Sequence, residues 1–110
     1  MFRKLRITTE ENIKTIKRII SECFADNEII LFGSRARSDN SPDSDYDLMV
    51  IIPDKMDYSE KIEFSCKITA LLAKEKISAD VLVENRNEIN KKKFYIGSVV
   101  REALKEGIRI

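Results

Sequence analysis

The sequence has no histidine and no tryptophan among its 110 residues, and it has only two cysteines, two prolines and three glycines. Without histidine, the usual zinc sites, Ser-His-Asp catalysis and an imidazole general base are excluded. Any proton transfer that the chain performs must therefore use carboxylates, lysines, tyrosines or cysteines.

An excess of one charge is also missing, because 20 Lys and Arg residues stand against 19 Asp and Glu residues, a net charge of +1. A balanced chain has no general electrostatic attraction to nucleic acid or membrane, so direct nucleic-acid binding is not expected. No apolar run approaches the roughly 20 residues of a membrane span. After the first five residues, where a signal peptide would have its apolar segment, this sequence has charged residues. A signal peptide is therefore not expected.

The length is sufficient for one domain with its own core, predicted over residues 1–110. Cys23 and Cys66 lie in apolar helical patterns and lack CxxC spacing. Both are predicted to be buried, reduced thiols, which fits a location in the reducing cytoplasm.

Helical and strand patterns alternate along the chain. Thr8-x-x-Glu11 resembles a capping box and predicts a helix over residues 9–25. Apolar runs predict strands over 28–32 and 46–52, joined by a polar segment with a short helical turn.

The second half repeats this alternation. Asp57-x-x-Glu60 predicts the start of a helix over residues 58–76. Its apolar face is expected to contain Ile62, Cys66, Ala70 and Ala73, widened by Phe64, Ile68, Leu71 and Leu72. A third strand is predicted over 79–84, and Asn87 is expected to cap a final helical region in two pieces. The inward residues of that region are expected to be Ile96, Val99, Val100, Ala103 and Leu104.

Gly107 is expected to stop the last helix, and residues 108–110 to add a short end strand. These elements predict an α/β (α+β) fold, a small mixed sheet of about three to four strands with helices packed against it.

The segment between the first two predicted strands carries a distinctive set of polar residues. Alternation along a strand predicts that Asp45 and Asp47 project from the same face. Adjacent carboxylates repel unless a cation or solvent neutralises them, and Mg²⁺ commonly takes one or two carboxylates together with substrate phosphates. Upstream, Gly33 allows close backbone approach, and Ser34 can cap a helical turn whose free amides face a phosphate.

Gly33-Ser34, ten residues and then Asp45-x-Asp47 resemble the signature of the polymerase-beta-type nucleotidyltransferase superfamily. The fuller run, Gly-Ser-Arg-Ala-Arg-Ser followed by Asp-Ser-Asp-Tyr-Asp-Leu, is similar to the minimal nucleotidyltransferases (MNT). These are small bacterial and archaeal proteins often paired with a HEPN-domain partner. The resemblance covers nearly the whole chain and implies the nucleotidyltransferase fold.

The resemblance also implies a catalytic set of three carboxylates. Asp45 and Asp47 would hold two Mg²⁺ ions, and a third carboxylate would stand on the strand after the long helix. Asp80 lies inside that predicted strand, on the face that also carries Leu82. It is expected to hold the catalytic metal and to help deprotonate the attacking hydroxyl.

Simpler interpretations exist for the same residues. Asp45 and Asp47 also fit the end of a polar loop, Asp80 fits a solvated edge-strand residue, and Ser34 fits a helix cap alone. Arg35 and Arg37 are expected either to reach the triphosphate or to form a solvated basic surface. Asp43 fits the loop and Tyr46 fits packing on the opposite face. Lys91-Lys92-Lys93 fits a solvated helix face.

The activity that the resemblance implies is Mg²⁺-dependent transfer of a nucleoside monophosphate, expected to be AMP from ATP, onto a hydroxyl. Larger relatives carry further domains that hold the acceptor, so here a partner protein is expected to present it. The expected partner is a HEPN-type toxin with an acceptor tyrosine, and the chain would be its antitoxin, in a homo- or hetero-oligomer. Two alternatives remain: an antitoxin that acts by binding alone, and a nucleotidyltransferase for a small molecule such as an antibiotic.

Overall fold

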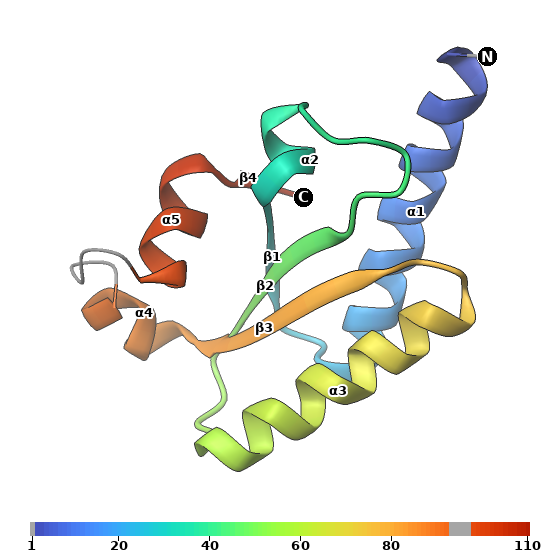
Figure 1. Ribbon diagram of the computed structural model, residues 1–110. Coiled ribbons are helices and arrows are strands. Elements are labelled where there is room, and N and C mark those ends of the chain that lie inside the picture. Colours follow the sequence, from blue (N-terminus) through green and yellow to red (C-terminus); the bar gives the residue numbers. More distant parts are fainter. Residues whose placement is uncertain (1, 93–97) are drawn as a thin grey trace.

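The computed structural model describes residues 2–92 and 98–110, with side chains from residue 10 onward. The described residues form α1 (Phe2–Cys23), β1 (Glu28–Phe32), α2 (Gly33–Arg37), β2 (Tyr46–Ile52), α3 (Tyr58–Lys74), β3 (Ala79–Asn85), α4 (Arg86–Lys92), α5 (Val99–Glu106) and β4 (Ile108–Arg109). The strands form one sheet in the order β3-β2-β1-β4, as Figure 1 shows. β2 and β3 are parallel, whereas β1 is antiparallel to both β2 and β4. The predicted class, a small mixed sheet with helices against it, is confirmed.

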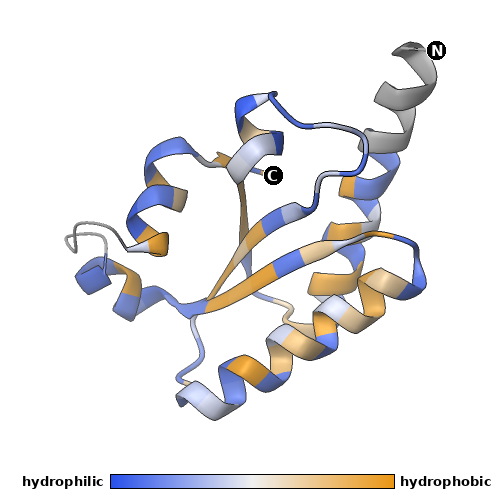
Figure 2. Ribbon diagram, viewed as in Figure 1, coloured by the Kyte–Doolittle hydropathy of each residue, from blue (hydrophilic) through white to orange (hydrophobic). Residues whose placement is uncertain are grey.

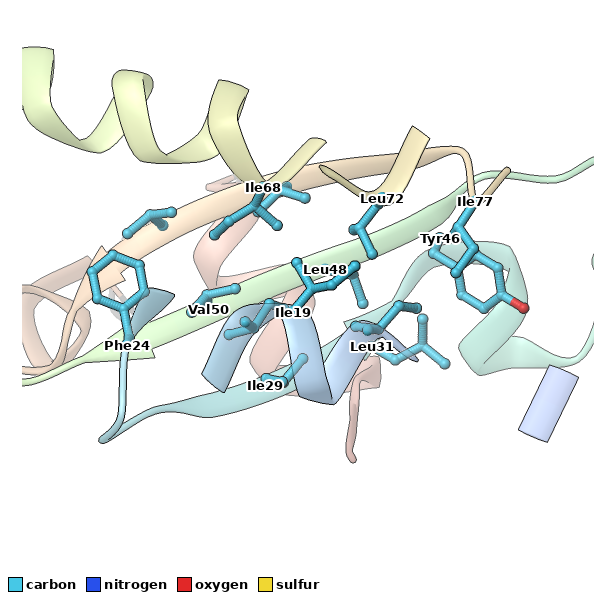
Figure 3. Packing of buried hydrophobic residues seen from close by; sticks show 14 of the residues in the cluster. Ile19, Phe24, Ile29, Leu31, Tyr46, Leu48, Val50, Ile68, Leu72 and Ile77 are labelled. Atoms are coloured by element: carbon cyan, nitrogen blue, oxygen red, sulfur yellow. The ribbon is translucent and has the colours of Figure 1, made fainter. Parts of the chain in front are cut away.

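One face of the sheet is covered by α1 and α3. Alternate residues of β2 point toward these helices because side chains alternate along a strand. Leu48 and Val50 are fully buried there against Ile16 and Ile20 of α1 and Leu72 of α3. Figure 3 shows the labelled members of this cluster interleaving between the strands and the helices. This packed layer fixes the position of β2, which carries Asp47.

The opposite face of the sheet is covered by α4 and α5. Met49 and Ile51 of β2 pack there with Ile89 of α4 and with Val100 and Ala103 of α5. Apolar residues follow the strands, whereas the segment between α2 and β2 is mostly hydrophilic (Figure 2). The polar segment therefore lies outside both cores.

The predicted start of α3 is confirmed in atomic detail. The Asp57 carboxylate accepts a hydrogen bond from the Glu60 amide at 2.8 Å, and the Glu60 carboxylate accepts one from the Asp57 amide at 3.2 Å. The helix ends at Lys74, two residues before the predicted end. Lys76 has a left-handed backbone, with a φ of 60°, and turns the chain toward β3.

The predicted start of the first helix is wrong. α1 begins at Phe2 and ends at Cys23, so the Thr8-x-x-Glu11 segment lies inside the helix rather than before it. No proline or glycine interrupts the residues before Thr8, so the helix can continue through them. At the other end, the Asn27 side chain donates to the Phe24 carbonyl at 2.7 Å and holds the chain as it leaves α1.

The apolar face of α3 differs from the prediction. Phe64, Ile68, Leu71 and Leu72 pack against the sheet, whereas Ile62, Cys66, Ala70 and Ala73 are exposed. The first set has the larger apolar side chains, so its burial removes more apolar area from water. Cys66 is therefore an exposed free thiol, contrary to prediction, and Cys23 is a partly buried one.

The C-terminal region also corrects two predictions. Asn85, rather than Asn87, caps α4: its side-chain oxygen accepts hydrogen bonds from the Asn87 and Glu88 amides. On α5, Val100 and Ala103 are buried as predicted, but Val99 and Leu104 are exposed. The expected inward position of Ile96 lies outside the described residues. Within the described part of the chain, none of the helices has the length and apolar content needed to cross a membrane.

Candidate active site

Asp47 and Asp80 occupy equivalent places on two neighbouring strands. They are register partners in the parallel pairing of β2 with β3. Asp47 lies on the same face of β2 as Met49, and Asp80 lies on the same face of β3 as Leu82. Met49 and Leu82 both contact the core beneath α4 and α5. The two aspartates therefore share the α5 side of the sheet, at the end where β2 and β3 begin.

Asp45 lies one residue before β2 and is exposed. Its carboxylate accepts a hydrogen bond from the hydroxyl of Ser78, which stands just before β3. Burial, followed by the charges of Asp80 and Asp45, raises the pKa of Asp47. Asp45 and Asp80 are therefore close enough to Asp47 to raise its pKa.

The donor set suits a hard divalent cation. Carboxylate oxygens are the ligands that Mg²⁺ prefers, and a cation would offset the repulsion that raises the pKa of Asp47. Among the described residues, no three acidic or cysteine side chains are arranged around a common point at which a metal ion could bind. Asp45 and Asp80 are both exposed, so their side chains can change rotamer without disturbing the core.

Gly33 shows why glycine is required at this position. Its φ is 73°, in the left-handed region that side chains disfavour. A Cβ atom built on Gly33 would lie 2.1 Å from Oδ2 of Asp47. The Asp47 carboxylate therefore packs directly over the Gly33 backbone, which joins the Gly-Ser turn to the aspartates.

The short helix α2 follows this turn. Phe32 occupies its N-cap position without a side-chain hydrogen bond, so the prediction that Ser34 is the cap is wrong. Ser34 is instead the second helical residue and is half-buried. α2 ends at Arg37, and the C-cap residue Ser38, with a φ of 62°, turns the chain into the polar loop.

Arg35 makes contacts within the loop that leads to Asp45. Its Nε donates to the Ser44 carbonyl at 3.0 Å, and its Nη2 donates to the Pro42 carbonyl at 3.3 Å. The guanidinium also stacks on the ring of Tyr46, 4.0 Å from the centroid. Arg35 thereby fixes the chain on both sides of Asp45. Tyr46 is buried on the face opposite the aspartates, as predicted.

Arg37 lies on the aspartate side of α2, close enough to lower the pKa of Asp47 against the stronger effects that raise it. Its guanidinium bonds Asp39 at 3.0 Å and Glu106 at 3.1 Å. Glu106, the last residue of α5, also accepts a hydrogen bond from the Gly33 amide. Sequence reasoning missed Glu106, since it lies far along the chain from both partners and belongs to no motif.

Lys91 and Lys92 belong to α4 and lie away from this site. Lys92 bonds the buried carboxylate of Glu84, so it is not part of a free basic surface, while Lys91 is exposed. Lys93 lies outside the described residues. Asp43 is an exposed loop residue, as predicted.

A cavity of about 210 Å³ opens beside Asp45, lined by Asn12, Arg35, Pro42, Asp43, Ser44, Tyr46, Lys76, Ile77 and Ser78.

The nucleotidyltransferase domain family matches residues 13–110, which include Gly33, Ser34 and the three aspartates. The chain belongs to this family. No curated protein sequence matches the chain at a significant level.

Solved structures share the fold at low sequence identity. A proposed nucleotidyltransferase from Sulfolobus solfataricus has a TM-score of 0.65 and 19% identity, covering 96% of this chain and 82% of its own. A chain from the Shewanella oneidensis complex of a tri-AMPylated HEPN toxin with an MNT antitoxin has a TM-score of 0.55 and 19% identity, covering 91% and 69%. A chain from a toxin–antitoxin complex with AMP-PNP has a TM-score of 0.53 and 21% identity, covering 91% and 70%. The nucleotidyltransferase fold is thus confirmed.

Proposed function

We propose that the chain transfers a nucleoside monophosphate from a nucleoside triphosphate to a hydroxyl group on a partner protein. The observation that carries the proposal is the register pairing of Asp47 with Asp80, beside Asp45 and over the Gly33 turn. Membership of the nucleotidyltransferase family supports the reaction class. A protein that only binds its partner has no need for clustered carboxylates that repel one another.

In this proposal Asp45 and Asp47 hold two Mg²⁺ ions, and Asp80 holds the catalytic one with them. When bound, the metal ions would neutralise the negative charge that develops on the phosphate oxygens. The Gly33 backbone and the Ser34 hydroxyl contact the phosphates, and Arg37 adds a positive charge beside them. Arg35 contributes by holding the loop around Asp45.

The chemical step is an in-line displacement at the α-phosphorus. The acceptor oxygen forms a bond to that phosphorus, and the bond to the oxygen that bridges to the β-phosphate breaks, so pyrophosphate leaves. Asp80 accepts the proton of the attacking hydroxyl. A carboxylate serves as the general base here because the chain has no histidine. Positioning and charge neutralisation supply most of the rate enhancement.

For the acceptor we propose a tyrosine of a HEPN-type toxin, with AMP from ATP as the transferred group and this chain as the antitoxin. Two structures with the same fold support this: one contains a tri-AMPylated HEPN toxin with its MNT antitoxin, and the other contains AMP-PNP. The free thiols of Cys23 and Cys66 fit a reducing cytoplasm.

Intact-mass measurement tests the proposal. The chain is purified with its gene-neighbour partner and incubated with Mg²⁺ and each nucleoside triphosphate in turn. We expect a gain of one or more AMP groups on the partner, lost in Asp80→Asn and retained in Asp43→Asn, the matched loop control. Neutralisation of the partner without any adduct would support the binding antitoxin instead. Turnover of a small hydroxylated acceptor without the partner would support the small-molecule enzyme.

A further inference from the structure

The Glu106 carboxylate is bonded to two hydrogen-bond donors, the Gly33 amide and Arg37, that lie beside the proposed phosphate position. Its Oε1 accepts hydrogen bonds from the Gly33 amide at 3.3 Å and from Nη1 of Arg37 at 3.1 Å. α5 and α2 contact each other, so the end of α5 lies against the Gly-Ser turn (Figure 1). One oxygen of Glu106 thus binds a backbone amide and a guanidinium together.

The end of α5 is a position at which the helix macrodipole disfavours a carboxylate. Glu106 is the last residue of α5, where the helix macrodipole is negative and favours a cation. The two donors therefore offset a repulsion that a neutral side chain would avoid.

An amide and a guanidinium that converge on one oxygen form a typical pair for binding phosphate oxygens. The Glu106 oxygen stands in for such a phosphate oxygen. The Glu106 side chain is 29% exposed and that of Arg37 is 48% exposed, so the carboxylate can rotate into solvent without movement of α5.

We propose that Glu106 is a latch that competes with the nucleotide's phosphates for the Gly33 amide and Arg37, and thereby sets nucleotide affinity. The inference rests on the proposed function, because it assumes that a triphosphate binds at the Gly-Ser turn. Binding of the triphosphate releases the Glu106 carboxylate, and loss of pyrophosphate returns it to the same donors. The latch thereby lowers the affinity of the chain for the triphosphate.

Glu106→Gln and Glu106→Ala separate this role from a structural one. Glutamine retains the shape and an acceptor oxygen but removes the charge, and alanine removes the competitor altogether. Glu102, one turn earlier on α5, is exposed, and its side chain makes no hydrogen bond or ion pair with any described residue. Glu102→Gln is therefore the matched control for loss of one negative charge from the same helix.

The test is calorimetric titration of Mg²⁺-ATP into the chain and each variant, with circular dichroism to check that each is folded. We expect both Glu106 variants to lower Kd by at least about fivefold, the size of effect expected when a charged competitor for two hydrogen-bond donors is removed. Glu102→Gln should leave Kd unchanged. In steady-state assays Glu106→Gln should lower KM for ATP without lowering kcat, which a merely structural contact would not do.

The outcomes separate the latch from the proposed function. Binding by the unchanged chain, with equal or weaker binding by Glu106→Gln, overturns the latch and leaves the proposed function intact. Binding by the Glu106 variants where the unchanged chain binds too weakly to measure supports the latch. No binding by any folded variant overturns both proposals together.

Discussion

Asp47 on β2 and Asp80 on β3 are direct partners across a parallel pair of strands, and both lie on the α5 side of the sheet. Neighbouring strands lie about 4.8 Å apart, which brings two carboxylates together without help from any loop. The repulsion between them is a property of the fold, because both backbones are fixed by the core beneath. The site therefore has a measurable effect on stability as well as on activity.

The pH dependence of stability should reveal the raised pKa of Asp47. Burial, then Asp80 and Asp45, raise that pKa above the ordinary value of 3.8, so the folded chain binds this proton more tightly than the unfolded chain. Without divalent cations, the free energy of unfolding should therefore fall as pH rises through the window between the unfolded and folded pKa values of Asp47. Above that window the full penalty remains.

Asp47→Asn should remove this contribution and raise the melting temperature at neutral pH by a few degrees, since 1 kcal/mol corresponds to roughly 4–8 °C in a small domain. The measurement is thermal unfolding in EDTA over roughly pH 4 to 7, compared with Asp43→Asn in the exposed loop. A variant less stable than the unchanged chain at neutral pH would contradict the prediction.

Mg²⁺ should stabilise the unchanged chain, and removal of the site should abolish that effect. At a Mg²⁺ concentration about tenfold above Kd, linkage gives roughly 1.4 kcal/mol of added stability. Asp45→Asn and Asp47→Asn should lose most of it, while Asp43→Asn keeps it. The readout is the shift in melting temperature between EDTA and Mg²⁺. Equal shifts in all variants would exclude Asp45 and Asp47 as the ligands.

Gly33→Ala should destabilise the chain through two separable effects. The left-handed φ of 73° costs about 1–2 kcal/mol for alanine. The clash of its Cβ with Oδ2 of Asp47 adds to this cost. In a double-mutant cycle, Asp47→Ala should relieve the second effect and leave the first, giving a coupling energy of about 1 kcal/mol or more by urea denaturation. Strict additivity would show that Gly33 and Asp47 do not meet.

The sequence predicts the strands well because each has a local cause. Residues 28–32 and 46–52 are apolar on both faces, which is typical of strands covered by helices on both sides, and the structure has both at those bounds. The placement of Asp45 and Asp47 at the start of the second strand is predictable for the same reason, whereas the inclusion of Asp80 in the site rests on the family resemblance.

What the sequence misses depends on contacts between distant segments. Two apolar stripes compete on α3, and only the packing of the sheet decides that Cys66 faces solvent. Glu106 contacts Gly33 across 73 positions of the chain, and no periodicity or motif connects them. An arginine after the Gly-Ser turn is a residue type that can bind phosphate, which is what the sequence suggests for Arg35. Its bonds to the Ser44 and Pro42 carbonyls depend on the fold of the loop and cannot be read from the sequence.

Arg35→Ala should loosen the loop that carries Asp45. It removes the two carbonyl hydrogen bonds and the stacking on Tyr46, at a cost of about 2 kcal/mol in the free energy of unfolding. Arg35→Lys keeps the charge but cannot reproduce the two-bond geometry, so it should behave much like alanine in stability and in protease cleavage of the loop. Full stability in Arg35→Lys would point to a role of charge alone.

Asn85→Ala should be among the more destabilising changes outside the apolar core. Asn85 is buried, and its side-chain amide donates to the Pro53 and Asp54 carbonyls at 3.2 and 2.7 Å. Its oxygen accepts from two amides at the start of α4. Alanine leaves these groups unsatisfied, so we expect a loss of about 2–4 kcal/mol.

The matched control is Asn87→Ala, an exposed asparagine two residues away that sequence alone favours as the cap. It should change stability by less than about 0.5 kcal/mol. Urea unfolding of both variants gives the comparison, and an unchanged m-value keeps the two-state interpretation valid. If the two losses were equal, the cap would not reside in Asn85, and the packing of α4 against the end of β3 would need another explanation. If Asn85→Ala alone lowers the midpoint, the connection from β3 to α4 depends on this one side chain, 3% exposed, bridging two loops.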